Sequence, residues 1–206
     1  DVDSYRVAGQ EVAPVLHPSL LFTGKMDFRP NVDAILWFAN EILPLIREQV
    51  PEAHLCVVGQ KPHARLNVLQ GHPGVTLTGF VPDIRPYLRA ADVYIAPLRM
   101  GSGTRFKLLE AMAMSRAVVS TTVGAEGLAI TTGYDMLLAD TAEDFARAVV
   151  QILANEGRRL ELGFNAARLV RDTYTWDAII PQVELAYERF LKGRVRAVRA
   201  GETDAR

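Results

Sequence analysis

The sequence predicts an α/β protein built on a doubly wound parallel sheet. The first observation is an alternation, repeated about five times, of a short apolar run, a turn residue and an amphipathic segment of helical period. The second is size, because 206 residues with a hydrophobic fraction of 49% are enough to bury one domain core. Together they favour one sheet with helices on both faces.

The predicted strands are short apolar runs that stop at a glycine, a proline or a small polar residue. They span residues 20–23, 54–58, 75–78, 93–96, 117–122 and 136–139. Ligands of such sheets bind beyond the carboxyl ends of the strands. The turns that follow these strands are therefore the first place to look for a binding site.

The predicted helices show apolar residues at helical spacing. They span residues 32–46, 106–114, 142–154, 156–172 and 176–190. Pro44 is expected to kink or end the first of them, because proline lacks the backbone N–H that the helix needs. The last helix carries one apolar stripe, which includes Trp176 and Phe190.

Composition excludes several classes of protein. The 23 Lys and Arg residues against 24 Asp and Glu give a formal charge of −1, which excludes binding to nucleic acid or to an anionic membrane chiefly through bulk positive charge. No apolar run reaches the roughly 18 residues of a spanning helix. We expect a cytoplasmic protein without a metal site, because Cys56 and the four histidines share no ligand spacing.

The most informative segment is a glycine-rich loop followed by a helix. Residues 101–104 read Gly-Ser-Gly-Thr, which leaves backbone N–H groups and a helix N-terminus open to an anion such as phosphate. Thr104 is expected to cap that helix. Lys107 and Glu110 share one helical face and offer a cation for phosphate and a carboxylate for sugar hydroxyls. A plain turn, a capped helix and a surface Lys–Glu pair would account for the same spacing.

At this point the chain resembles a known family. The run 101–114, with residues 118–128 behind it, is similar to the retaining GT-B glycosyltransferases of family GT4. The likeness extends to residues 22–27, 30–34, 57–59, 75–82, 136–140 and 174–176. It covers about residues 20–191 and looks closest to sugar transferases of bacterial exopolysaccharide systems. The resemblance implies one Rossmann-like half of a two-domain GT-B enzyme, the half that binds the donor.

The resemblance also implies the substrates. The donor would be a nucleoside diphosphate sugar of the UDP or GDP type, transferred with retention to an unidentified glycan or lipid-linked acceptor, without metal or other cofactor. Acceptor binding would belong to an N-terminal domain that this chain lacks. We therefore expect the chain alone to bind donor and to turn over little or nothing.

Two positions carry family roles, one of them altered. Glu110 matches the acidic residue that binds the donor ribose. The family has a second carboxylate eight residues earlier, which contacts the transferred sugar, and this chain has Ser102 there. Ser102 can donate and accept a hydrogen bond but brings no charge.

The cations also depart from the family. Lys25 stands where many members carry an arginine that binds the diphosphate, and the family's nearby lysine corresponds to Pro30. A second cation therefore comes from Arg29, Arg105 or Lys107, or is absent. We assign no catalytic residue in this domain, and Lys25 and Lys107 are the candidates to stabilise the leaving phosphate.

The remaining candidates lie on neighbouring turns. Phe80 and Val81 match the stretch whose backbone reads the nucleobase, and Arg99 is either a donor contact or a solvated loop arginine. Glu126 is interpreted as a supporting or helix-capping residue. The candidate substrate-binding set is Gly24, Lys25, Phe80, Val81, Arg99, Gly101, Ser102, Gly103, Thr104, Lys107 and Glu110.

The chain divides into four expected parts. Residues 1–18 are read as an interdomain linker, 19–172 as the donor-binding domain, 173–192 as a helix that crosses back to the missing domain, and 193–206 as a disordered tail. Without that domain, the stripe within 176–190 predicts an exposed apolar patch or a self-association surface. Peripheral membrane association of the full enzyme stays open.

Two other functions remain possible from the sequence. A non-catalytic module that binds a nucleotide or nucleotide sugar is favoured by Ser102. A GT-B-fold epimerase of sugar nucleotides would need its own acid/base pair, and no convincing pair is present.

Overall fold

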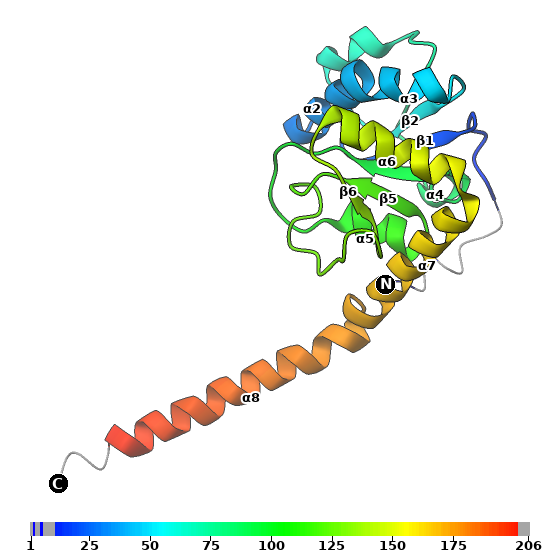
Figure 1. The fold of residues 1–206 in the computed structure, drawn as a ribbon. Coiled ribbons are helices and arrows are strands. Elements are labelled where there is room, and N and C mark those ends of the chain that lie inside the picture. Colours follow the sequence, from blue (N-terminus) through cyan, green and yellow to red (C-terminus); the bar gives the residue numbers. More distant parts are fainter. Residues whose placement is uncertain (1, 3–4, 6–10, 202–206) are drawn as a thin grey trace.

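The protein, described by a computed structural model, forms a six-stranded sheet with helices on both faces (Figure 1). The structure describes residues 2, 5 and 11–201, with side chains up to residue 191. The strand order is β3-β2-β1-β4-β5-β6, and every pair is parallel. The predicted fold class is confirmed.

The strands match the predicted runs closely. They are β1 Ser19–Thr23, β2 His54–Val58, β3 Val75–Gly79, β4 Val93–Ala96, β5 Ala117–Ser120 and β6 Leu137–Leu138. β5 ends two residues earlier than predicted, because the Thr121 side chain accepts a hydrogen bond from the Gly124 amide at 2.9 Å and so stabilises a turn there.

The sheet has a core on each face because successive side chains of a strand point to opposite sides. Leu20 and Phe22 pack with α2 (Arg29–Trp37), α3 (Leu43–Gln49) and α6 (Ala142–Ala154). Leu21 packs with α4 (Arg85–Ala90), α5 (Phe106–Ala113) and α7 (Glu156–Thr173). The central strands β1, β2, β4 and β5 are therefore buried along their whole length, whereas the edge strands β3 and β6 are partly exposed.

Pro44 interrupts the first helical segment as predicted. The chain takes a π-helical turn over Phe38–Ile42, and Pro44 is then the second residue of α3. The wider turn accommodates a residue that has no N–H and whose ring would clash with a carbonyl one turn earlier. The helix continues afterwards and ends at Gln49, three residues beyond the predicted end.

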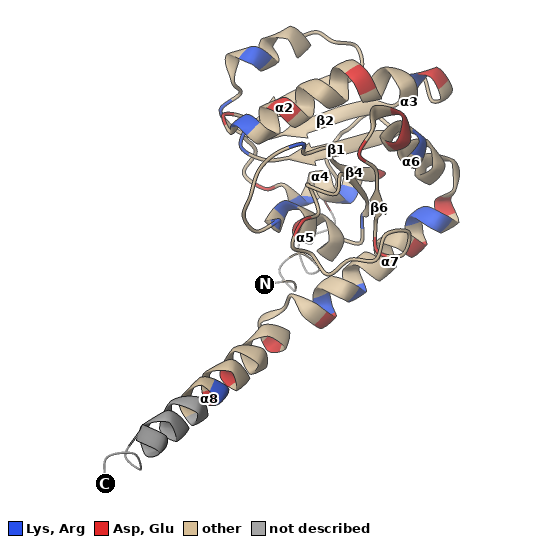
Figure 2. Cartoon of the chain, turned by 60° about the vertical axis from the view of Figure 1, so that its left-hand side comes forward, with Lys and Arg blue, Asp and Glu red and all other residues tan. Residues whose placement is uncertain are grey.

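Of the described residues 11–18, which lead into β1, Ala13 is buried against the domain. The Ala13 amide donates to the Pro86 carbonyl at 3.1 Å, and the Ser19 amide donates to the Asp92 carboxylate at 2.8 Å. A 3₁₀ helix, Ala64–Leu69, lies between β2 and β3. Acidic and basic residues are interspersed over the described elements (Figure 2), in keeping with the small net charge.

The C-terminal helix α8, Trp176–Gly201, extends away from the domain (Figure 1). The side chains of Trp176, Tyr187 and Phe190 are 66%, 67% and 63% exposed, which confirms the predicted exposed apolar patch. The backbone is helical to Gly201, although a disordered tail was expected from residue 193, and the alanines and arginines of 194–200 favour helix. Residues 202–206 lie outside the described residues. None of the described helices is both long and apolar enough to cross a membrane.

Candidate functional site

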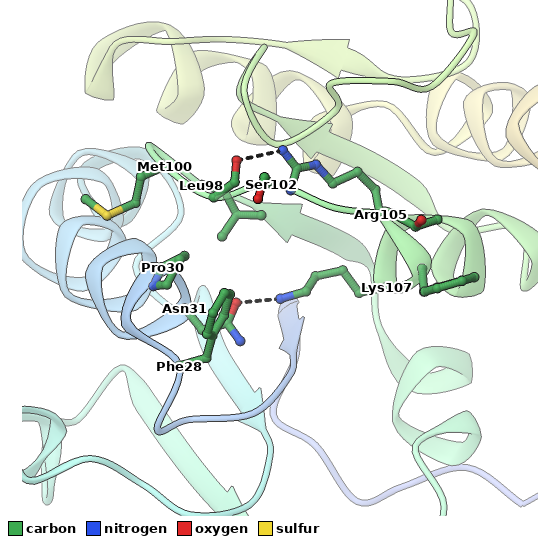
Figure 3. Close-up of a pocket in the computed structure, with 11 residues that line it drawn as sticks. Phe28, Pro30, Asn31, Leu98, Met100, Ser102, Arg105 and Lys107 are labelled. Carbon is green, nitrogen blue, oxygen red and sulfur yellow. Dashed lines mark hydrogen bonds between the residues drawn. The ribbon is translucent and has the colours of Figure 1, made fainter.

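The candidate site lies at the carboxyl ends of the strands, where the strand order reverses between β1 and β4. One cavity of about 180 Å³, the Ser102 cavity, lies between the start of α2 and the loop after β4 (Figure 3). A second of about 310 Å³, the Phe80 cavity, lies beyond β1, β2 and β3. The Ser102 cavity is lined by residues that include Asn31, Gly101, Ser102, Thr104, Arg105 and Lys107. The Phe80 cavity is lined by residues that include Gly24, Lys25, Phe80, Val81, Lys107 and Glu110.

Lys107 is the residue common to these two cavities. Its Nζ donates to Asn31 Oδ1 at 2.7 Å and lies 4.3 Å from the centroid of the Phe22 ring (Figure 3). Burial lowers the pKa of Lys107 from 10.5 to about 8. The amine is thus a buried cation held by an uncharged amide and an aromatic face, which makes it a favourable partner for an incoming anion.

Glycines keep the space next to Lys107 open. A Cβ on Gly24 would lie 2.8 Å from Asn31 Nδ2 and 3.0 Å from Lys107 Nζ. A Cβ on Gly59 would lie 1.8 Å from the Gly24 carbonyl oxygen. Only glycine at position 59 therefore lets the ends of β1 and β2 approach this closely. The predicted glycine turns after these strands form the floor of the Phe80 cavity.

The glycine-rich loop leaves the N-terminus of α5 without a side-chain cap. Gly101 and Gly103 have φ of +121° and +92°, which glycine adopts readily. α5 begins at Phe106, and the capping position is Arg105, whose side chain makes no capping hydrogen bond. The prediction that Thr104 caps the helix is wrong, because Thr104 lies one residue too early. The amides of Phe106 and Lys107 in the first turn of α5 therefore have no side-chain cap as a competitor, and both residues line the Ser102 cavity.

Arg105 and Lys107 reach separate partners (Figure 3), and Arg105 ties two loops together. It is 7% exposed, and its Nη2 donates to the carbonyls of Val123 at 2.8 Å and Gly101 at 3.2 Å. The same nitrogen lies 3.4 Å from Glu126 Oε2, so Glu126 contacts this arginine, as its interpretation as a supporting residue requires. Arg105 Nε has no hydrogen-bond partner among the described residues.

Arg99 binds Asp33 and lies outside both cavities. Its guanidinium donates two hydrogen bonds to Asp33, at 2.8 and 3.0 Å, and stacks 5.1 Å from the Trp37 ring. In the described structure it lines neither of the two cavities, and nor does Arg29. Of the three residues weighed as the second cation, Lys107 is the one that reaches the junction of the cavities.

Glu110 stands beside a third cavity. Lys107 and Glu110 both line the Phe80 cavity, as their spacing predicts, but Glu110 also lines a cavity of about 420 Å³, the Tyr5 cavity. There the Tyr5 hydroxyl donates to Glu110 Oε1 at 2.6 Å. Burial, and secondly this hydrogen bond, raise the pKa of Tyr5. Sequence reasoning missed Tyr5 and Asn31, because each reaches the site only through the fold.

The remaining candidates line the Phe80 cavity from its outer side. Phe80 is 72% exposed, and Val81 lies next to it. The Lys25 side chain is 55% exposed, with its Nζ 3.7 Å from Asp27. Within the described residues, no group of three or more His, Cys, Asp or Glu is placed to hold a metal ion.

Sequence comparison finds a family and several relatives. The family model described as Glycosyl transferases group 1 matches residues 17–155. An uncharacterized 44.6 kDa protein in the cps region of Klebsiella pneumoniae is 23% identical over 180 residues, covering 78% of this chain and 46% of that protein. The phosphatidyl-myo-inositol mannosyltransferase of Mycolicibacterium smegmatis is 29% identical over 178 residues, covering 82% and 45%. The chain spans about half the length of the curated relatives it matches.

Solved structures share the fold. The C-terminal domain of a glycosyl transferase group 1 family protein (LpcC) from Francisella tularensis superposes with a TM-score of 0.66 at 17% identity, covering 85% of this chain and 98% of that one. Anabaena Alr3699/HepE in complex with UDP superposes with a TM-score of 0.71 at 14% identity, covering 92% and 55%.

Proposed function

Because the chain belongs to the Glycosyl transferases group 1 family, we propose that it is the donor-binding half of a nucleotide-sugar-dependent glycosyltransferase. The observation that carries the proposal is the position of Lys107, a buried cation at the junction of the Ser102 and Phe80 cavities. A nucleoside diphosphate sugar needs such a junction, because its two negative charges lie between two larger neutral groups.

The donor would lie across both cavities, with its nucleoside in the Phe80 cavity and its sugar in the Ser102 cavity. The nucleoside occupies the Phe80 cavity, with the base near Phe80 and Val81 and the ribose hydroxyls on Glu110. The diphosphate lies at Lys107 and the uncapped N-terminus of α5, with Lys25 at its outer side. The sugar then enters the Ser102 cavity, where Ser102 supplies a neutral hydrogen-bonding group. Gly101, Gly103 and Thr104 form the loop that borders it.

The chemistry follows from this placement. When the bond between the anomeric carbon and the β-phosphate oxygen breaks, negative charge builds up on the leaving diphosphate. Lys107 and the first-turn amides of α5 are fixed in advance near that charge and stabilise it without reorganisation, and Lys25 adds a second cation from the outer side. The diphosphate in turn favours the charged form of Lys107, which burial alone disfavours.

The acceptor would bind to a second domain that supplies the rest of the enzyme. This part of the proposal is supported by coverage, since the chain matches about half of each relative. The relative in a cps region supports a role in bacterial surface polysaccharide synthesis. UDP in the HepE structure supports a donor of the UDP type, with GDP as the other candidate. We propose no cofactor besides the donor, and a cytoplasmic location where that donor is available.

A thermal-shift panel with UDP, GDP, ADP and CMP tests the proposal. A ligand at about 100 times its Kd adds roughly 2.7 kcal/mol, which raises Tm by about 5–10 °C for a chain of this size. We expect one nucleoside diphosphate to give this shift and Glu110→Ala to lose it. Glu184→Ala, an exposed carboxylate on α8, is the matched control and should keep it. Failure of all four nucleotides to raise Tm of the unmodified chain would refute the proposal.

A further inference from the structure

Glu110 separates two cavities, and the proposed donor uses only one of them. Its carboxylate lines the Phe80 cavity on one side and the Tyr5 cavity on the other. The Tyr5 cavity is lined by residues that include Val2, Tyr5, Leu109, Tyr174, Trp176 and Ile179. Val2 and Tyr5 thus lie on the side of Glu110 that faces away from the Phe80 cavity.

The contact between them is short and specific. The Tyr5 hydroxyl donates to Glu110 Oε1 at 2.6 Å, across 105 positions of sequence. Tyr5 is half-buried, packs with the core on the α5 side of the sheet, and is held in part by its amide, which donates to the Val2 carbonyl at 3.1 Å. Because Tyr5 bonds to Oε1 from the far cavity, Oε2 keeps its accepting capacity for the Phe80 cavity.

We propose that Tyr5 is a positioning residue, which holds the Glu110 carboxylate in the orientation that accepts hydrogen bonds from the donor ribose. The inference rests on the proposed function, since it assigns a role within the same site. It also gives the segment before the domain a direct effect on donor affinity.

The physical argument is preorganisation. A glutamate side chain has several rotamers, and fixing one of them during binding costs affinity. A charge-assisted O–H···O⁻ hydrogen bond of 2.6 Å fixes the carboxylate before the nucleotide arrives. A tyrosine hydroxyl is protonated at neutral pH and so can donate, and the raised pKa of Tyr5 extends this state to higher pH.

The test is isothermal titration of the 206-residue chain with UDP and GDP and with their 2′,3′-dideoxy analogues. Tyr5→Phe removes the hydroxyl and keeps the ring. We expect it to weaken binding of the ribonucleotide that the unmodified chain prefers by about tenfold, the usual effect of one hydrogen bond. For the dideoxy analogue, which offers Glu110 no hydroxyl, unmodified chain and variant should agree within about twofold.

Two further variants keep the test specific. Tyr174→Phe is the matched control, because Tyr174 lines the same cavity but its hydroxyl accepts from the Ala129 amide at 2.6 Å. It should bind the ribonucleotide as the unmodified chain does. In a Glu110→Gln background, Tyr5→Phe should cost clearly less affinity, because the Tyr5 hydroxyl then makes only a neutral hydrogen bond to the amide oxygen.

Several outcomes would overturn the inference. Equal or tighter ribonucleotide binding by Tyr5→Phe would show that the hydroxyl is irrelevant or competes with ribose. An equal loss for the dideoxy analogue, or for Tyr174→Phe, would show a general structural effect. If the unmodified chain bound neither UDP nor GDP, the proposed function itself would fail and the inference with it, whereas binding without a Tyr5 effect would overturn the inference alone.

Discussion

Replacing Lys107 by methionine is expected to stabilise the unliganded chain and to abolish its response to nucleoside diphosphates. Methionine keeps the apolar stem that packs beneath the site but removes the amine. In the unliganded chain that amine is a cation in a largely buried position, held by Asn31 Oδ1 at 2.7 Å. Such a group lowers the stability of the unliganded folded protein, and it contributes favourable free energy only when an anion binds to it.

The magnitude follows from the pKa of Lys107. Burial lowers it from 10.5 to about 8, and at about 1.4 kcal/mol per pKa unit this is about 3 kcal/mol of destabilisation at neutral pH. Loss of the hydrogen bond to Asn31 offsets about 1 kcal/mol. The net gain of about 2 kcal/mol should raise Tm by roughly 4–8 °C.

The stability advantage of Lys107→Met decreases with pH in a defined window. Between pH 8 and 10.5 the unfolded chain holds the Lys107 proton and the folded chain releases it. The free energy of unfolding of the native chain should therefore rise through this window, an increment that Lys107→Met lacks. The advantage of the variant should be largest at pH 7 and small at pH 10.5.

The assay is thermal melting at pH 7 and at pH 10, with and without the preferred nucleoside diphosphate. Lys25→Met is the matched control, because the Lys25 side chain is 55% exposed. It should weaken nucleotide binding while leaving the unliganded Tm within about 1 °C. A lower unliganded Tm for Lys107→Met at pH 7, or a full nucleotide response by that variant, would refute the reasoning.

Three other outcomes are expected. Gly59→Ala should lose the nucleotide response and at least about 2 kcal/mol of stability, because its Cβ would lie 1.8 Å from the Gly24 carbonyl oxygen. Gly157→Ala, at an exposed helical position, should keep the nucleotide response and should not lower stability, because alanine favours helix over glycine. Arg105→Met should lower the midpoint of urea unfolding by an amount equal to about 2 kcal/mol, because two loops lose their shared donor, and an unchanged midpoint would contradict this. The purified chain should transfer no sugar, and any turnover in a radiolabelled donor assay would contradict the assignment of acceptor binding to another domain.

Periodicity was enough to predict the fold. Helices 142–154 and 156–172 match α6 and α7 to within one residue, because one-sided burial in long helices imposes a clear period. Boundaries set by a single side chain were missed, such as the end of β5 at Ser120, where the Thr121 hydroxyl stabilises a turn. Both ends of strand 54–58 were predicted correctly, because the apolar run stops at Gly59, where the close approach to Gly24 requires a glycine.

The site was predicted in part. Lys107 and Glu110 lie on one helix, so their spacing alone placed them on one face. Whether Arg99 or Arg105 faces a ligand depended on partners far along the chain: Asp33 holds Arg99, and the carbonyl of Val123 holds Arg105. Each guanidinium lies at the end of a long, flexible side chain, so the local sequence does not restrict the direction in which it points.

What the sequence determined by itself is therefore the sheet, its glycine turns and the shared face of the candidate residues Lys107 and Glu110 on α5, since these follow from local period and spacing. The tertiary structure alone decided which cation stands at the junction of the two cavities and which residue lies behind Glu110. The physical reason is the separation of the contacting residues along the sequence. Side chains such as Asn31 and Tyr5 act through contacts of less than 3 Å that join segments 76 and 105 positions apart, and only the packed fold brings those segments together.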